Sequence, residues 1–317
     1  MQITLPAMQC PIAPAIHPLV QHAEDHTGQW LRQFKLLDET AYEQYRKQGF
    51  AYMVSRMFPD ATEPMLYALT DINTLLFLLD DEIDHQLGQG KGIGQKEALK
   101  SFVAEFISVL VESTPSAELK NPVLAALADF WERMCAMTSV YWQASFIASI
   151  KQTFDAALWQ LNNVERGKLP TVAEFIKYRN YLGAANIATD SIIAVQGLTG
   201  NFGHLNARVA ELTLLCRNIV CWANDLYSLS KEVEHGDMYN LVLLIQHEDN
   251  LTLEDAIVKA VEKHNTDMDA FLTLAGDLLT KDHSTELELY ISSLKYIIRG
   301  NVDWSEKETT RYQFQMR

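Results

Sequence analysis

Cysteine is scarce in this chain of 317 residues, and its four copies form no CxxC pair and no paired framework. We therefore expect no disulfide scaffold, and reduced thiols are typical of a cytoplasmic protein. Glycine and proline are also few, with 14 and 9 residues, and they form no linker, low-complexity tract or internal repeat. We expect one domain spanning residues 1–317, with residues 1–30 as an extended N-terminal arm because four of the prolines fall there.

Basic residues are outnumbered, with 26 Lys and Arg against 41 Asp and Glu and a formal net charge of −15. A protein of this charge repels phosphate backbones, which argues against nucleic acid as a partner. The apolar runs are too short and too interrupted to span a bilayer, and residues 1–4 lack the basic start of a signal peptide. With 48% hydrophobic residues, the chain can still bury a large core.

Strand signals are scarce as well, whereas apolar residues recur with the helical period along most of the sequence. This pattern predicts an all-α fold. Many segments are apolar on more than one side, as expected for a helical bundle around a central cavity. We expect helices at residues 40–57, 63–86, 95–113, 121–140, 142–165, 172–198, 204–235, 238–247, 253–279 and 284–299.

Two polar clusters interrupt this apolar helical sequence. The first is DDEID at residues 80–84, directly after the run LLFLL, and the second runs from Asn224 to Glu232. Acids at the border of a core segment are costly to desolvate unless they are paired or bound to a cation. The two clusters therefore predict two walls of one metal-lined cavity.

Within each cluster the spacing is that of one helix face. Asn224, Ser228 and Glu232 fall within about 80° of arc at one-turn intervals, and Glu232 leans back toward Asn224. An amide, a hydroxyl and a carboxylate form a hard oxygen set that suits Mg²⁺ or Mn²⁺ rather than zinc. In the first cluster Asp80 and Asp84 share a face and can hold one or two further ions.

With both clusters in this order, the chain resembles the bacterial class I terpene synthases over nearly its whole length. Their aspartate-rich motif is matched by residues 80–84, and their NSE motif by the second cluster. Smaller matches are FPDA at residues 58–61, Arg179 ahead of the NSE motif, GDMYNLV at residues 236–242, Trp304, and the pair Arg311 and Tyr312.

The resemblance implies roles for residues outside the metal sites. Arg179 would sense the diphosphate, Leu182 would be the linker, and Gly183 would be the effector, whose backbone carbonyl faces the pocket at a helix break. The linker is often Asp or Asn in relatives, whereas Leu182 cannot form a hydrogen bond through its side chain. The other implied diphosphate donors are Lys231, Arg311 and Tyr312.

The resemblance also implies the reaction. The protein would ionise an allylic prenyl diphosphate, cyclise the carbocation to a sesquiterpene or diterpene, and release diphosphate. Three Mg²⁺ ions are implied, two at Asp80 and one at the NSE residues, with Mn²⁺ as a substitute, and they would draw an anionic substrate to an acidic protein. Phe77 and Trp304 would line a dry, apolar cavity, where each ring face stabilises a cation by about 0.5–2 kcal/mol. Farnesyl diphosphate is favoured over geranylgeranyl diphosphate. The oligomeric state stays open, with a homodimer as one option.

Three other interpretations stay open from the sequence. A chain-elongating prenyltransferase shares the fold and the first motif, but should carry a second DDxxD where this chain has the NSE motif. A helical di-iron protein would use the E-x-x-H patterns at residues 82–85 and 232–235, and it needs two more glutamates, for which Glu105 and Glu132 are candidates. A non-catalytic helical scaffold would lack Mg²⁺-dependent diphosphate binding.

Overall fold

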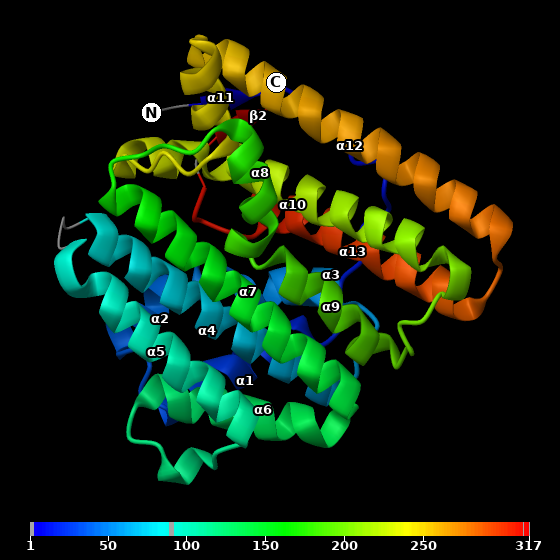
Figure 1. The fold of residues 1–317 in the computed structure, drawn as a ribbon. Helices are drawn as coiled ribbons and strands as arrows, with labels where there is room; N and C mark the ends of the chain where they lie inside the picture. The colour runs from blue at the N-terminus through cyan, green and yellow to red at the C-terminus, as the bar shows by residue number, and fades with distance from the viewer. Residues whose placement is uncertain (1–2, 89–91, 313, 317) are drawn as a thin grey trace.

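A computed structural model describes residues 3–88, 92–312 and 314–316, and the side chains of residues 83–95, 315 and 316 are outside that description. The side chain of Asp84, a predicted metal ligand, therefore lies outside the described residues. Helices make up most of the described chain, which confirms the all-α prediction (Figure 1). The α-helices are α1 (Val20–Gln33), α2 (Glu39–Arg46), α3 (Phe50–Met57), α4 (Glu63–Gly88), α5 (Gly92–Glu112), α6 (Pro122–Met137), α7 (Val140–Glu165), α8 (Val172–Leu182), α9 (Ala185–Gln196), α10 (Asn206–His235), α11 (Leu241–Asp249), α12 (Leu253–Lys281) and α13 (Thr285–Lys307). Two short 3₁₀ helices are η1 (Ser116–Glu118) and η2 (Gly203–Leu205), and the strands are β1 (Ile3–Leu5) and β2 (Phe314–Met316).

The long helices pack as two groups. On one side α10 packs against α12 and α13, and α13 also packs against α3; on the other, α4 packs against α3 and α6, and α5 against α7 (Figure 1). Helices α8 and α9 pack against both α7 and α10. Within the described part of the chain, no helix combines the length and the apolar character needed to cross a membrane.

The predicted extended arm over residues 1–30 is wrong from Val20 onward, where the chain is helical. The helix α1 begins at Val20, directly after the last of the four prolines, Pro18. Its side chains Trp30 and Leu31 are buried in the core, and α1 packs against α3 and α4. Because proline is tolerated at a helix start but not inside it, the proline-rich stretch ends where the helix begins.

Several predicted helix boundaries also move. The helix expected over residues 40–57 is divided into α2 and α3 by Gly49, which has a left-handed φ of 66° and so accepts a turn that other residues resist. The last helix does not end at residue 299 but continues to Lys307, so Trp304 stands on α13.

The two ends of the chain form a small parallel sheet that the sequence did not predict. Strand β1 pairs with β2, with Ile3 opposite Phe314 and Leu5 opposite Met316. Both Ile3 and Leu5 are buried, so the N-terminal segment is fixed in the core. Figure 1 shows the C-terminal segment running from the end of α13 to this sheet, which fixes the course of residues 308–312.

Candidate active site

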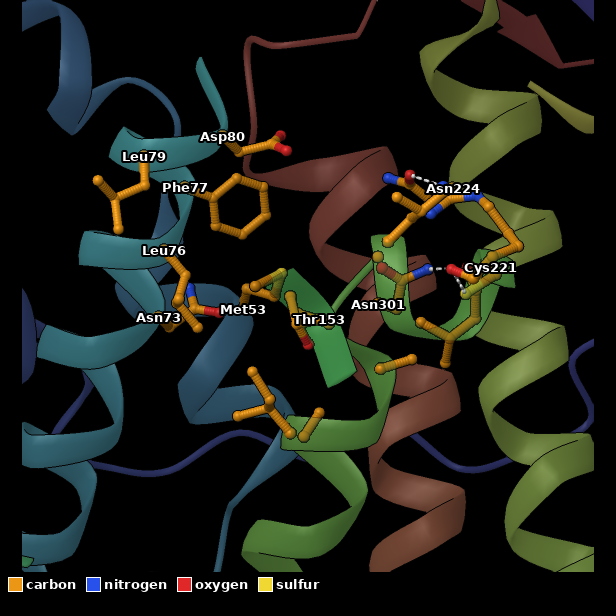
Figure 2. A pocket seen from close by; sticks show the side chains of 18 of the residues that line it. Met53, Asn73, Leu76, Phe77, Leu79, Asp80, Thr153, Cys221, Asn224 and Asn301 are labelled. Atoms are coloured by element: carbon orange, nitrogen blue, oxygen red, sulfur yellow. Dashed lines mark hydrogen bonds between the residues drawn. The ribbon is translucent and has the colours of Figure 1, made fainter. Parts of the chain in front are cut away.

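A cavity of about 270 Å³ lies between the two groups of helices, and its lining comes from α3, α4, α7, α8, α9, α10 and α13. Both polar clusters reach it, because Asp80 on α4 and Asn224 and Glu232 on α10 belong to its wall. Figure 2 shows the Asp80 carboxylate pointing across the cavity toward Asn224 on the opposite wall. The two clusters, 144 residues apart in sequence, thus face one space.

Asp80 stands at one rim of this cavity and keeps exposed surface there. Loss of hydration and the neighbouring charge of Asp81 together raise the pKa of the Asp80 carboxyl. A carboxylate in such surroundings gains from a bound cation, because the cation offsets both effects.

The three NSE residues lie along one face of α10. The Ser228 Oγ is 2.7 Å from Glu232 Oε1 and 2.8 Å from the backbone carbonyl oxygen of Asn224. The Asn224 side-chain oxygen accepts a hydrogen bond of 2.8 Å from Arg179, which leaves one of its two lone pairs available. The side-chain oxygens of Ser228 and Glu232 are therefore in contact, and Asn224 lies one turn earlier on α10.

Glu232 carries the clearest sign that this group fits a cation. Asn240 donates its side-chain amide to Glu232 Oε2, so both carboxylate oxygens are held in place. Burial and then the nearby charge of Asp225 raise the pKa of the Glu232 carboxyl to about 8. The charge of Arg179 offsets these effects only in part, and the set of an amide, a hydroxyl and a carboxylate oxygen suits a hard divalent ion.

Arg179 is buried on α8 and is fixed by the residue that follows Asn224. Its Nε and Nη2 donate to Asp225 Oδ1 at 2.8 and 2.6 Å. Burial alone would lower the pKa of Arg179, but the Asp225 carboxylate outweighs it and raises that pKa. Asp225 also accepts the backbone N–H of Leu241 at 3.0 Å through Oδ2. Arg179 is thus a permanently charged donor, held between α8 and α10.

The predicted break after Arg179 is present. Helix α8 ends at Leu182, and Ala184 has a left-handed φ of 51° before α9 begins at Ala185. The backbone N–H of Ile187, which would bond the Gly183 carbonyl in a continuous helix, bonds Ala184 instead at 3.1 Å. Leu182 and Gly183 both line the cavity. A Cβ on Gly183 would stand 2.6 Å from Arg179 Nη1, so a larger residue here would displace the guanidinium.

The C-terminal segment connects the two polar clusters, because Arg311 contacts Asp81 on α4 and Tyr312 contacts Asn224 on α10. Arg311 grips Asp81 with two hydrogen bonds of 2.7 and 2.9 Å, and Lys231 approaches the same carboxylate at 3.5 Å. The Arg311 hydrogen bonds outweigh burial and lower the pKa of the Asp81 carboxyl. Tyr312 accepts a hydrogen bond of 2.8 Å from the Asn224 amide. The predicted donors therefore converge beside both polar clusters.

Aromatic rings border the metal end of the cavity. Phe77, one turn before Asp80, stacks on Phe50 at 4.1 Å between centroids and lies 6.1 Å from Trp304, and both Phe77 and Trp304 line the cavity. The Arg311 guanidinium stands 5.3 Å from the Phe77 ring centre. Trp222 on α10 is not among the lining residues; its indole N–H donates to Asp267 at 2.7 Å.

Sequence reasoning missed Asp225 and Asn240, which orient Arg179 and Glu232. Asp225 follows Asn224 directly and therefore lies about 100° around α10 from it. This position indicates that Asp225 contacts a different part of the protein, but the sequence does not identify the contact. The alternative di-iron site does not form among the described residues, where no group of three His, Cys, Asp or Glu side chains could hold a metal. His235 is exposed and its ring nitrogen bonds the Lys231 carbonyl, so the second E-x-x-H pattern does not face one site.

Known proteins agree with this geometry. The family described as terpene synthase family 2, C-terminal metal binding, matches residues 71–270. The chain is 31% identical to the (+)-T-muurolol synthase of Roseiflexus castenholzii, a protein described as cyclising (2E,6E)-farnesyl diphosphate, over 95% of this chain and 92% of that one. It is 26% identical to the germacrene A synthase of Nostoc punctiforme, over 98% and 96%.

A solved structure supports the fold. The linalool/nerolidol synthase from Streptomyces clavuligerus superposes with a TM-score of 0.78 at 21% identity, covering 94% of this chain and 99% of that one. The family match spans well over half of the chain and is described as a metal-binding region, which implies that the protein uses a divalent metal. Sequence, fold and relatives together make this chain a member of the bacterial class I terpene synthases, and the protein is a terpene synthase.

Proposed function

We propose that the protein ionises farnesyl diphosphate, with geranylgeranyl diphosphate as the next candidate, and cyclises the resulting carbocation to a sesquiterpene or diterpene with release of diphosphate. One observation carries the proposal: a single apolar cavity ends in two polar clusters and three cationic side chains. An anionic head group and a hydrocarbon chain need these two environments side by side.

The metal would be Mg²⁺, with three ions and with Mn²⁺ as a substitute. Asp80 and Asp84 would hold two ions, and Asn224, Ser228 and Glu232 the third. The ions supply charge stabilisation to the leaving diphosphate. The only partly compensated Glu232 carboxylate is the feature of this chain that supports the assignment.

The protein's own donors act on the same group. Arg179, Lys231, Arg311 and Tyr312 would bind the diphosphate oxygens and keep the head group at the mouth while the carbon–oxygen bond breaks. Gly183 would turn its backbone carbonyl, released from the helical ladder, toward the newly formed cation, with Leu182 beside it. Because Leu182 offers no hydrogen bond, Arg179 would act on Gly183 through the backbone of α8 rather than through a side-chain relay.

The body of the cavity would shape the product. Phe77 and Trp304 present ring faces to the carbocation, and each face is worth about 0.5–2 kcal/mol. The cavity volume of about 270 Å³ lies slightly below the roughly 300–1,000 Å³ typical of ligand pockets. This small size supports the C15 substrate over the C20 one, as does the farnesyl diphosphate named for the Roseiflexus relative.

We further propose that residues 1–317 form one catalytic domain, that the protein works in the cytoplasm, and that a homodimer is an option for its assembly. The cavity draws on helices from α3 to α13, which supports one domain. All four cysteines are free, as expected in a reducing compartment. Light scattering in solution will test the homodimer.

Incubating purified protein with geranyl, farnesyl or geranylgeranyl diphosphate and Mg²⁺ tests the proposal. We expect released diphosphate and a cyclic C15 product by gas chromatography–mass spectrometry, and neither after chelation. Full turnover in excess chelator would overturn the metal mechanism. A longer linear prenyl diphosphate made with added isopentenyl diphosphate would instead identify a chain-elongating transferase.

A further inference from the structure

One polar side chain interrupts the apolar wall that α4 gives to the cavity. Leu69, Ile72, Leu76 and Phe77 line the cavity from this helix, and Asn73 lies among them. Asn73 precedes Asp80 by seven residues, so it lies on nearly the same helix face and about 10 Å deeper. Figure 2 shows Asn73 beside Leu76, well below Asp80 and Phe77, with its amide toward the cavity. An amide group thus stands where the hydrocarbon chain of the substrate would lie.

The Asn73 amide is not tied to the protein. Its Nδ2 is buried and has no hydrogen-bond partner among the described residues. The hydroxyls that line the same cavity differ, because Thr153 donates to the Ser149 carbonyl at 3.1 Å and Ser191 to the Ile187 carbonyl at 2.8 Å. A buried amide donor without a partner is costly and is normally satisfied by protein or by water.

We propose that Asn73 holds a water molecule inside the cavity and that this water ends the reaction, so that the main product is a cyclic terpene alcohol rather than a hydrocarbon. The inference rests on the proposed function of the cavity. Because no protein partner fixes which amide position holds nitrogen and which holds oxygen, the position that faces the cavity (Figure 2) can offer the water either a donor or an acceptor. Thr153, which lines the cavity from α7, keeps an acceptor lone pair as a further partner for the water.

The step balances with water as the only co-reactant. The water oxygen gives an electron pair to the electron-deficient carbon and forms a carbon–oxygen bond. The oxonium ion then loses one proton, which passes to the diphosphate released at the start. One prenyl diphosphate and one water therefore give one alcohol and one protonated diphosphate, with no change in oxidation state overall.

The position of Asn73 determines which cation is captured. A water two helical turns below Asp80 is remote from the carbon that loses the diphosphate at the mouth. Capture at the mouth would give an acyclic alcohol, whereas capture at the depth of Asn73 follows ring formation. The Asn73 amide oxygen can also orient the water by accepting a hydrogen bond from it. A lone pair of the water oxygen is then left to face the cation.

Turnover of farnesyl diphosphate in H₂¹⁸O tests the inference on the wild-type protein. We expect a cyclic alcohol that carries ¹⁸O as the main product. Diphosphate release with only hydrocarbon products would overturn the inference and leave the proposed function standing, whereas no diphosphate release from any prenyl diphosphate would overturn the proposed function itself.

Variants at Asn73 identify the residue responsible. Asn73→Leu keeps the side-chain size and removes the hydrogen bonds, so we expect the alcohol fraction to fall about tenfold in favour of cyclic hydrocarbon while diphosphate release continues. Asn73→Val gives the same test with a smaller side chain if leucine blocks the substrate. Ser191→Ala is the matched control, because its hydroxyl is already engaged, and it should keep the wild-type alcohol fraction. An unchanged alcohol fraction in a turning-over Asn73 variant, or an equal fall in Ser191→Ala, would refute the role of Asn73.

Discussion

The Arg179–Asp225 pair yields a quantitative prediction for Asp225→Asn. Asp225 is only 1% exposed. One of its oxygens accepts from the Arg179 guanidinium at 2.6 and 2.8 Å, and the other accepts the Leu241 N–H at 3.0 Å. Asparagine has one carbonyl oxygen, so its NH₂ group must face one of these two donors. The substitution thus removes a charge and creates a contact between two donors in a buried place.

The expected cost follows from that geometry. Removing one partner of a buried ion pair costs about 3–5 kcal/mol because the other charge is left without compensation. The free energy of unfolding of a typical protein is about 5–15 kcal/mol, so the loss is a large part of it. The melting temperature should fall by roughly 10 °C. With Arg179 no longer held, kcat/KM for diphosphate release should fall about ten- to a hundredfold.

Urea unfolding followed by circular dichroism will measure the stability, and a coupled diphosphate assay the activity. Asp249→Asn is the matched control, because the Asp249 carboxylate is exposed to solvent and forms an ion pair of 2.9 Å with Lys259. The loss of this surface pair should change the free energy of unfolding by less than about 1 kcal/mol. The reasoning fails if Asp225→Asn unfolds within about 0.5 kcal/mol of the wild type, the range of ordinary surface changes.

The remaining predictions concern the metals, the cavity and acid stability. Asp80→Asn should abolish cyclisation while circular dichroism stays native, whereas His85→Ala should retain activity; the opposite order would favour a di-iron site. Inorganic diphosphate should bind in calorimetry only when Mg²⁺ is present. Phe77→Ala and Trp304→Phe should shift the products toward acyclic or early-quenched compounds while diphosphate release continues; an unchanged chromatogram would place both rings outside the reaction. Asp303 is buried, and its hydrogen bonds from Arg299 and Lys307 outweigh burial and lower the pKa of its carboxyl. The stability that this carboxylate supplies is present above its unfolded pKa of about 3.9 and is lost as pH falls through its lower folded pKa. In Asp303→Asn, the melting temperature should therefore fall less steeply with decreasing pH than in the wild type.

Local periodicity allowed the sequence to predict most of the site. The ligands on α10 repeat every four residues and therefore share a face wherever that helix packs. Phe77 and Asp80 are three residues apart on α4 and are therefore also neighbours on one side of their helix. The break at Gly183 and the donors Arg311 and Tyr312 came from the resemblance to known synthases, since neither composition nor period distinguishes them from surface residues.

What the sequence did not predict depends on contacts between distant segments. The partner of Arg179 could not be read from Asp225, because 46 residues separate them and only the packing of α8 on α10 brings them together. Strand β1 pairs with β2 across nearly the whole chain, and three-residue strands have no recognisable period. The start of α1 was not predicted because the four prolines before it indicate extended chain, whereas the helix already begins at Val20.

The charges at the mouth of the cavity support the proposal that this acidic protein binds its anionic substrate through metal ions. Its cationic side chains are already engaged, because Arg179 is paired with Asp225, and Arg311 and Lys231 share Asp81. Beyond these pairs, the carboxylates of Asp80 and Glu232 form no ion pair with a side chain among the described residues. Burial first, and then a neighbouring carboxylate, raises the pKa of each carboxyl, although nearby cations oppose this. A diphosphate approaching this rim would meet repulsion that the protein's own donors are too occupied to offset. If divalent ions bind there as we propose, they would reverse the sign of the charge at the rim, and the same carboxylates would then attract the diphosphate through the ions.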